Sequence, residues 1–225
     1  MAQQLLISGT DTGVGKTVLT ALLAAYWQIH RPHLKTAIFK PLQSGVGDRE
    51  FYQTHFSLDQ SSQEITPLWY EQPLAPPIAA EREQRTVDLT QVWHTLELLQ
   101  KRFDQIWIEG VGGLGTPITY EITVADLARD WRLPTVLVVP VRLGSLGQAV
   151  ANVALARQVG LQLKGIILSS QSETALHQIE DLTPPWLLEN LTQVPVLGLI
   201  PPISSFRDRF HLAQVASGLN LEGLG

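Results

Sequence analysis

The segment that most constrains the fold is a glycine-rich loop ending in Gly-Lys-Thr near the start of the chain. Residues 9–17 read Gly-Thr-Asp-Thr-Gly-Val-Gly-Lys-Thr and directly follow the apolar run at 5–7. A strand that enters such a loop and continues into a helix directs backbone N–H groups and a helix N-terminus at one point, where a polyphosphate can bind. The sequence therefore predicts a phosphate-binding loop (P-loop) between a strand and a helix, with a nucleoside triphosphate as its ligand.

Each residue type of this loop suits a phosphate ligand. We expect Gly9, Gly13 and Gly15 to adopt positive φ angles and to let the backbone approach the phosphates closely. Lys16 would reach the β- and γ-phosphate oxygens, and the Thr17 hydroxyl could bind Mg²⁺. The alternative is an ordinary glycine-rich turn with a surface lysine. It is disfavoured because the strand, the loop and the helix follow in the order that phosphate binding requires.

Apolar strand-like segments alternate with helical patterns along the rest of the chain. Strands are predicted near 4–8, 36–39, 105–109, 134–140, 164–169 and 195–199. Helices are predicted near 17–30, 88–103, 123–131, 146–159, 174–192 (broken) and 207–217. Several strands are apolar at consecutive positions, as in sheets covered on both faces. We therefore predict an α/β fold of the P-loop NTPase type, with a doubly wound, mostly parallel sheet and helices on both faces. It would form one domain over residues 1–225.

In such a sheet the ligand lies outside the carboxyl ends of the strands. The first four predicted strands lead into the P-loop and into residues 40–45, 109–113 and 142–145. These four loops should therefore border one crevice. Lys40 could there neutralise a phosphoryl group in transit, the alternative being a surface lysine. Glu109 follows an apolar strand and could bind Mg²⁺, the alternative being a hydrogen-bonded structural carboxylate. The glycine-rich turn at 110–113 could offer N–H groups to an anion.

Composition excludes several classes of chemistry. The chain has no cysteine, so it can form no disulfide, thiolate zinc site or iron–sulfur cluster, and its six histidines show no metal-ligand spacing. The net charge is −5 and the basic residues are scattered, which argues against a nucleic-acid partner. A basic secretory signal and a membrane-spanning apolar run are both lacking, so we expect a cytoplasmic protein without a membrane partner.

The P-loop has an unusual length, because Gly9 lies seven residues before Lys16 and the usual glycine position holds Thr10. This loop, followed by Lys-Pro-Leu-Gln-Ser-Gly at 40–45 and Ile-Glu-Gly-Val-Gly-Gly at 108–113, resembles the dethiobiotin synthetase family over nearly the whole chain. The resemblance implies a Mg²⁺- and ATP-dependent cyclo-ligase of biotin synthesis. It would form the ureido ring of dethiobiotin from 7,8-diaminopelargonate and CO₂, with ADP and phosphate as the other products.

The resemblance also assigns roles to matching positions in this sequence. The catalytic residues would be Lys16 and Lys40, and the Mg²⁺ ligands would be Thr17, Asp48 and Glu109. Nucleotide binding would involve Thr12, Gly13, Val14, Gly15, Lys16, Thr17, Glu109 and Gly112. We also expect Ser169, at the end of the fifth predicted strand, and Pro201, after the sixth, to lie near the nucleotide. Substrate binding would involve Ser44, Gly112, Gly113, Leu143, Gly144 and Ser145. Thr116, Pro117 and Asp126 also match the family, but we assign them structural roles first.

The family resemblance implies a homodimer, in which the substrate carboxylate lies near the partner subunit at the helix N-terminus around 143–148. A free helix N-terminus suits a carboxylate. The helix predicted at 146–159 is small and apolar over more than one face, as expected at a subunit interface, although a helix buried within one subunit would look similar. One departure concerns Ser169 and Ser170, which replace a frequent Asn-Asp pair that reads adenine, so base selectivity stays open.

Two alternatives belong to other functional classes. A ParA- or MinD-like ATPase switch would share the doubly wound sheet, but such proteins carry a signature lysine early in the loop, where this chain has Asp11. Such switches also tend to carry an amphipathic membrane-binding C-terminus, and residues 217–225 of this chain lack that character. An amide-forming ligase related to the cobalamin pathway is disfavoured because the chain has no glutaminase domain with a catalytic cysteine.

Overall fold

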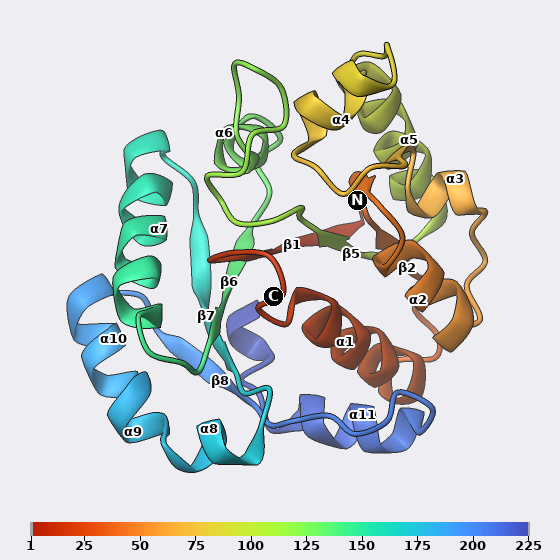
Figure 1. The fold of residues 1–225 in the computed structure, drawn as a ribbon. Helices are drawn as coiled ribbons and strands as arrows, with labels where there is room; N and C mark the ends of the chain where they lie inside the picture. Colours follow the sequence, from red (N-terminus) through yellow and green to blue (C-terminus); the bar gives the residue numbers. More distant parts are fainter. Residues whose placement is uncertain (1, 225) are drawn as a thin grey trace.

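The computed structural model describes residues 2–224, and its centre is a six-stranded parallel sheet (Figure 1). The strands are β1 (Gln3–Gly9), β2 (Thr36–Phe39), β5 (Gln105–Glu109), β6 (Thr135–Pro140), β7 (Leu163–Ser169) and β8 (Val196–Ile200). Their order is β2-β5-β1-β6-β7-β8, and every pairing is parallel. The predicted α/β class is confirmed, and each of the six predicted strands agrees with the structure to within one residue at either end.

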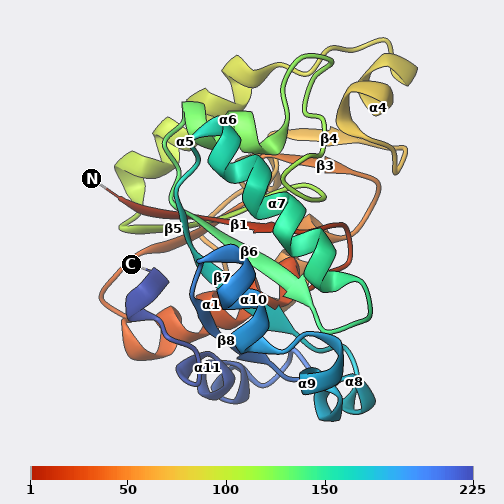
Figure 2. The same cartoon turned by 90° about the vertical axis from the view of Figure 1, so that its left-hand side faces the viewer.

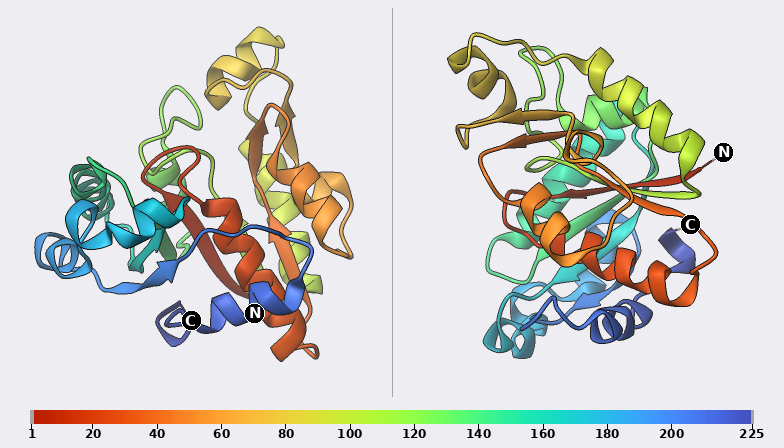
Figure 3. Two further views of the ribbon diagram at one scale, coloured as in Figure 1. Left: turned by 60° about the horizontal axis from the view of Figure 1, so that its bottom comes forward. Right: turned by 90° about the vertical axis from the view of Figure 1, so that its right-hand side faces the viewer.

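Helices cover both faces of this sheet, because successive strand side chains point to opposite faces and both sets are apolar. On one face Leu6, Ile108 and Val139 belong to the core shared with α5 (Leu89–Arg102), α6 (Val124–Asp130) and α7 (Ser145–Val159). On the other face Ile7, Trp107 and Val138 pack in a second core with α1 (Lys16–His30) and α11 (Arg209–Ser217). Figure 2 shows the two helix layers on opposite sides of the strands, and Figure 3 shows α1 beside α11.

Local signals explain where the long helices start. The backbone turns at Gly15 (φ 107°) before α1 and at Gly144 (φ 89°) before α7, and this left-handed conformation favours glycine. Helices α5 and α11 instead begin after aspartates, Asp88 and Asp208, whose carboxylates accept hydrogen bonds from the first free N–H groups. The N-termini of α1 and α7 lie at the edge of the sheet where the parallel strands end.

The segment from 42 to 86 forms elements that the sequence patterns did not define. Here β3 (Leu42–Ser44) and β4 (Leu68–Tyr70) make a small parallel sheet, accompanied by α2 (Asp48–His55), α3 (Ser62–Ile65) and α4 (Pro76–Arg82). Part of the predicted 40–45 loop is therefore a strand. The broken helix predicted at 174–192 consists of α8 (Glu173–His177), α9 (Ile179–Leu182) and α10 (Pro185–Thr192). The last described element is the 3₁₀ turn η1 (Glu222–Leu224), which follows α11. The prolines at 184 and 185 separate α9 from α10 because proline cannot continue a preceding helix.

No helix within residues 2–224 combines the length and the apolar character needed to cross a lipid bilayer.

Candidate functional site

The P-loop between β1 and α1 has the conformation of a phosphate-binding site. Gly13 and Gly15 have φ angles of 71° and 107°, as predicted. Gly9 does not have a positive φ, so that part of the prediction is wrong. The physical reason for a glycine there is space, since a Cβ atom would lie 2.5 Å from Val14 Cγ2. Lys16, the first residue of α1, folds back and donates from Nζ to the Asp11 carbonyl oxygen at 2.8 Å.

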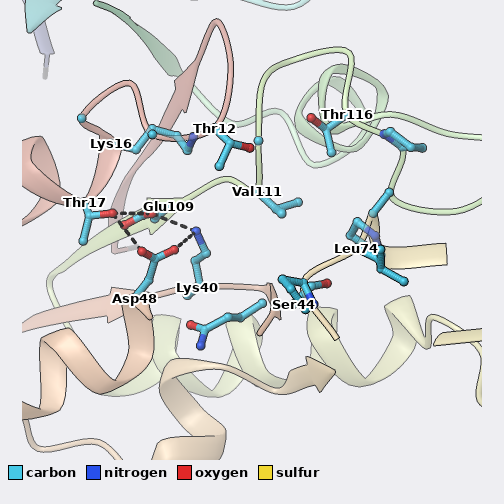
Figure 4. A pocket seen from close by; sticks show the side chains of 18 residues that line it. Thr12, Lys16, Thr17, Lys40, Ser44, Asp48, Leu74, Glu109, Val111 and Thr116 are labelled. Atoms are coloured by element: carbon cyan, nitrogen blue, oxygen red, sulfur yellow. Dashed lines mark hydrogen bonds and ion pairs between the residues drawn. The ribbon is translucent and has the colours of Figure 1, made fainter. Parts of the chain in front are cut away.

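Residues at the ends of four elements form a compact, mostly charged cluster at the edge of the sheet beside the P-loop (Figure 4). Lys40, which directly follows β2, places its Nζ 2.8 Å from Glu109 Oε1 at the end of β5 and 2.5 Å from Asp48 Oδ2 at the start of α2. The Thr17 hydroxyl of α1 donates to Asp48 Oδ1 at 3.0 Å and to Glu109 Oε1 at 3.1 Å. Among the predicted metal ligands, Thr17 thus lies within hydrogen-bond distance of both Asp48 and Glu109, although the three residues come from three parts of the chain.

The Glu109 carboxylate has a further partner that sequence reasoning did not identify. The hydroxyl of Tyr52, on α2, donates to Glu109 Oε2. Both side chains are fully enclosed, with 0% of Tyr52 and 1% of Glu109 exposed. Each oxygen of the Glu109 carboxylate therefore has a protein donor, as a buried charge requires.

Burial and mutual charge shift the pKa values in this cluster. Burial and the nearby charge of Lys40 lower the pKa of Lys16 to about 8. Burial opposes the charge on Lys40, but the carboxylates of Glu109 and Asp48 outweigh it and raise the pKa of Lys40. Burial raises the pKa of Glu109, whereas at Asp48 the pKa is lowered because Lys40 outweighs burial. Burial, Glu109 and Asp48 together raise the pKa of the Tyr52 phenol well above its usual value, so this hydroxyl remains a donor.

The cluster forms the wall of a cavity of about 610 Å³. Ten of the residues that the sequence assigned to the site line it: Thr12, Gly13, Gly15, Lys16, Thr17, Lys40, Ser44, Asp48, Glu109 and Gly112. Residues that the sequence analysis did not assign to ligands also line it, namely Gln43, Pro73, Leu74, Ala75, Pro76, Val111, Thr116 and Pro117. The Oγ atom of Ser44 is buried and has no hydrogen-bond partner within residues 2–224, so it is free to bind a polar group of a ligand.

Some predicted site residues lie outside this cavity lining. They are Val14, Gly113, Leu143, Gly144, Ser145, Ser169 and Pro201. The expectation that four loops border one crevice is therefore met by three loops, and the 142–145 loop is the exception. That loop instead lies beside the exposed part of the P-loop, and the Arg142 guanidinium is 3.9 Å from Asp11 Oδ2.

Gly113 lies beneath the P-loop rather than facing the cavity. Its N–H donates to Thr116 Oγ1 at 2.8 Å, which gives Thr116 a structural role. Asp126 is also structural, since its carboxylate accepts from the Thr123 N–H in the capping box that starts α6.

Positions missed by the sequence analysis carried weak signals. Gln43 fixes the loop before α2, because its amide donates to the Gly45 carbonyl oxygen and the Glu50 carboxylate, and its Oε1 accepts from the Arg49 N–H. It stands within the quoted Lys-Pro-Leu-Gln-Ser-Gly motif and could have been singled out there. For Tyr52 the only signal was its place one helical turn after Asp48.

Comparisons with known proteins agree with this geometry. A family model described as an AAA domain matches residues 3–208. The chain is 52% identical over 220 residues to the ATP-dependent dethiobiotin synthetase of Gloeothece citriformis, covering 98% of this chain and 97% of that protein. This chain belongs to the ATP-dependent dethiobiotin synthetase family. It is also 51% identical over 220 residues to the synthetase of Crocosphaera subtropica, covering 98% of both chains.

Similarity to solved structures extends to other P-loop proteins at the level of the fold. The cell division ATPase MinD of Pyrococcus furiosus superimposes with a TM-score of 0.59 at 16% identity, and the match covers 100% of each chain. This chain and MinD thus share the doubly wound sheet, while its sequence relationship is to the synthetases.

We expect the substitution Gly113→Ala to weaken ATP binding. The new Cβ would lie 2.8 Å from the Thr10 carbonyl oxygen and 3.1 Å from that of Gly9, backbone atoms that can move only with the P-loop. We expect the Kd for ATP to rise about tenfold or more, or about 1.4 kcal/mol, in calorimetric titrations. The matched control is Gly115→Ala, whose Cβ would meet only Leu155 Cδ2 at 3.6 Å. An unchanged Kd in the Gly113 variant would contradict the prediction.

Proposed function

We propose that residues 1–225 form one catalytic domain that closes the ureido ring of dethiobiotin from 7,8-diaminopelargonate, CO₂ and ATP. Membership of the synthetase family supports this activity. The observation that carries the assignment of residues is the position of Lys40 and its two carboxylates between the P-loop and Ser44, on one cavity. The cavity thus has a phosphate end and a separate polar end for the diamine.

The reaction requires two anions to approach one another. One amine adds to CO₂ and loses a proton to give a carbamate. A carbamate oxygen then attacks the γ-phosphorus of ATP and ADP leaves. The second amine attacks the carbonyl carbon of the resulting carbamic–phosphoric anhydride, which closes the ring and releases phosphate and a proton. Lys16 and Lys40 would bind oxygens of the transferring phosphoryl group and hold the carbamate oxygen in line, so that positioning and charge stabilisation carry the catalysis.

The donor set fits Mg²⁺ as a cofactor. Asp48, Glu109 and Thr17 present hard oxygen ligands next to the P-loop, and Mg²⁺ in such sites uses one or two carboxylates together with substrate phosphates. When bound, Mg²⁺ would supply positive charge to the phosphate oxygens. The two ammonium and two carboxylate groups of the site sum to zero formal charge, so they alone do not offset the charge of ATP. Lys40, which pairs with both carboxylates in this structure, would turn its ammonium toward the transferring phosphoryl group.

We propose that Ser44 holds the reacting diamine end and that the substrate carboxylate binds at 143–145 of a second subunit. The loop lies outside the cavity of its own subunit, and its Leu143 is 86% exposed. The backbone there leads into the N-terminus of α7, where free N–H groups favour an anion. Gly147, Ala151 and Ala154 are exposed along α7, which leaves a face of small residues for a partner helix.

The serines that replace the adenine-reading pair are enclosed. Ser169 and Ser170 are each 3% exposed, and the Ser170 hydroxyl donates to the Ser172 carbonyl oxygen at 2.9 Å. Ser169 lies against Gly15, where a Cβ atom would approach its Oγ to 2.3 Å. We propose that Ser169 supports the P-loop from below, and that Pro201 lies on the base side of the nucleotide.

We further propose that the enzyme works in the cytoplasm on small molecules, without a nucleic-acid or membrane partner. Its net charge is −5 and its basic residues are dispersed along the sequence.

Incubation with diaminopelargonate, bicarbonate and Mg-ATP tests the function directly. We expect dethiobiotin and ADP to form in equal amounts, because each ring closure consumes one γ-phosphoryl group. Mass spectrometry would quantify dethiobiotin, and a coupled assay would quantify ADP. ATP turnover that is indifferent to the diamine would contradict the proposal and favour a ParA- or MinD-like switch.

The two site lysines should have separable effects. Lys16→Ala should weaken ATP binding as well as turnover, because Lys16 would contact the nucleotide in the ground state. Lys40→Ala should act mainly on phosphoryl transfer and lower kcat by a hundredfold or more, about 3 kcal/mol. Calorimetric ATP binding and steady-state rates would be compared with those of the exposed-site variant Lys101→Ala. Near-native turnover of the Lys40 variant would overturn its assignment.

The proposed dimer predicts that a charge on the outer face of α7 impairs the shared site. Ala151→Glu should shift the protein toward monomers in sedimentation velocity at micromolar concentration and raise the KM for the diamine. Leu98→Glu on α5, also at an exposed position, serves as the control. A wild-type protein that sediments as a monomer with full activity would remove the shared-site proposal.

A further inference from the structure

We propose that Tyr52 is a positioning residue that fixes the Glu109 carboxylate for the metal–nucleotide complex. The inference rests on the proposed role of Glu109 as a Mg²⁺ ligand. Tyr52 does not line the cavity, so it would not touch substrate or nucleotide. Its hydroxyl donates to Glu109 Oε2, and its side chain is fully buried.

The two oxygens of Glu109 have different partners. Oε1 accepts from the Thr17 hydroxyl at 3.1 Å and from Lys40 Nζ at 2.8 Å, so this oxygen faces Thr17 of the P-loop and the Lys40 ammonium. Oε2 accepts from the Tyr52 hydroxyl. The last torsion of a glutamate side chain is intrinsically broad, so the carboxylate plane is set by its partners. When Lys40 turns to the phosphoryl group, the bond from Tyr52 keeps Oε1 directed at the P-loop.

Tyr52 also connects the two proposed carboxylate ligands to one another. It lies one helical turn after Asp48 on α2, and residues four apart share a helix face. Glu109 ends β5, a separate element, so the Tyr52–Glu109 bond ties the helix that carries Asp48 to the strand end that carries Glu109. The Tyr52 ring itself is held by Phe51 and Phe56, with ring centroids at 5.5 and 6.5 Å.

A purely structural role for Tyr52 makes a different prediction from a positioning role. If the hydroxyl merely filled a polar gap in the core, its loss would lower stability without changing how the protein binds metal. If it orients Glu109, its loss would weaken metal binding even where stability changes little. Partners that orient metal ligands typically change metal affinity 10- to 100-fold when removed.

The test is Tyr52→Phe, which removes the hydroxyl and keeps the ring. Mn²⁺ would serve as the probe, and its binding to the enzyme with a non-hydrolysable ATP analogue would be followed by electron paramagnetic resonance of free Mn²⁺. We expect a Kd for Mn²⁺ about tenfold higher than in the wild type, and a matching rise in the Mg²⁺ concentration that half-activates ring closure. The matched control is Tyr70→Phe. Tyr70 is also fully buried, but its hydroxyl contacts the Thr86 carbonyl oxygen at 3.4 Å, away from the cavity.

Glu109→Gln and the double variant with Tyr52→Phe separate this inference from the assignment on which it rests. We expect Glu109→Gln to weaken Mn²⁺ binding and Tyr52→Phe to add less than twofold in that background, because Tyr52 acts through Glu109. Weakened binding in Glu109→Gln with native binding in Tyr52→Phe would overturn the positioning role alone. Equal losses in the Tyr52 and Tyr70 variants would overturn it too. Native binding in Glu109→Gln would overturn the metal assignment itself.

Discussion

The ammonium group of Lys40, enclosed between two carboxylates, is the interaction on which the site depends. Lys40 is 3% exposed and Glu109 1%, and neither charge would be tolerated there without the other. Asp48 and Thr17 complete the arrangement from two helices. The cluster thereby joins β2, β5, α1 and α2 at one edge of the sheet. Replacing Lys40 or Glu109 leaves a buried charge without its nearest partner, so the contacts of this cluster hold the four elements together.

The same electrostatic balance prepares the site for its substrates. Opposite charges cancel before any ligand is present, so the pocket can fold without an excess of one sign. Its groups are nevertheless those that phosphoryl transfer needs, with ammonium donors for phosphate oxygens and carboxylates for a divalent cation. In the proposed mechanism, ligand binding would change the partners of charges that are already present. Lys16, which contacts the Asp11 carbonyl oxygen of its own loop, is likewise in place.

Sequence patterns predicted the parts of the fold that local chemistry determines. The six parallel strands are apolar on both faces and the P-loop has its own motif, so strands, loop and the residues Lys40 and Glu109 followed directly. The sheet of β3 and β4 did not, because its two short strands lie more than 20 residues apart and neither alternates clearly. Tyr52 was missed because a tyrosine in an amphipathic helix usually packs in the core, and its bond to Glu109 spans 57 residues. The 142–145 loop was placed in the crevice by a topological rule that ignores how far each loop extends.

The chain between β2 and β5 has a consequence for how such an enzyme can diversify. These strands are neighbours in the central sheet, yet residues 40–104 lie between them and contribute Ser44, Asp48 and the proline-rich wall at 73–76. The P-loop lies outside this excursion. Because closing a longer loop adds little entropic cost, the excursion can change in length or sequence while its ends remain anchored in the sheet. The proline-rich wall at 73–76 can thus change while the P-loop stays the same, whereas Asp48, in the same excursion, is tied to the P-loop by the Thr17 hydroxyl.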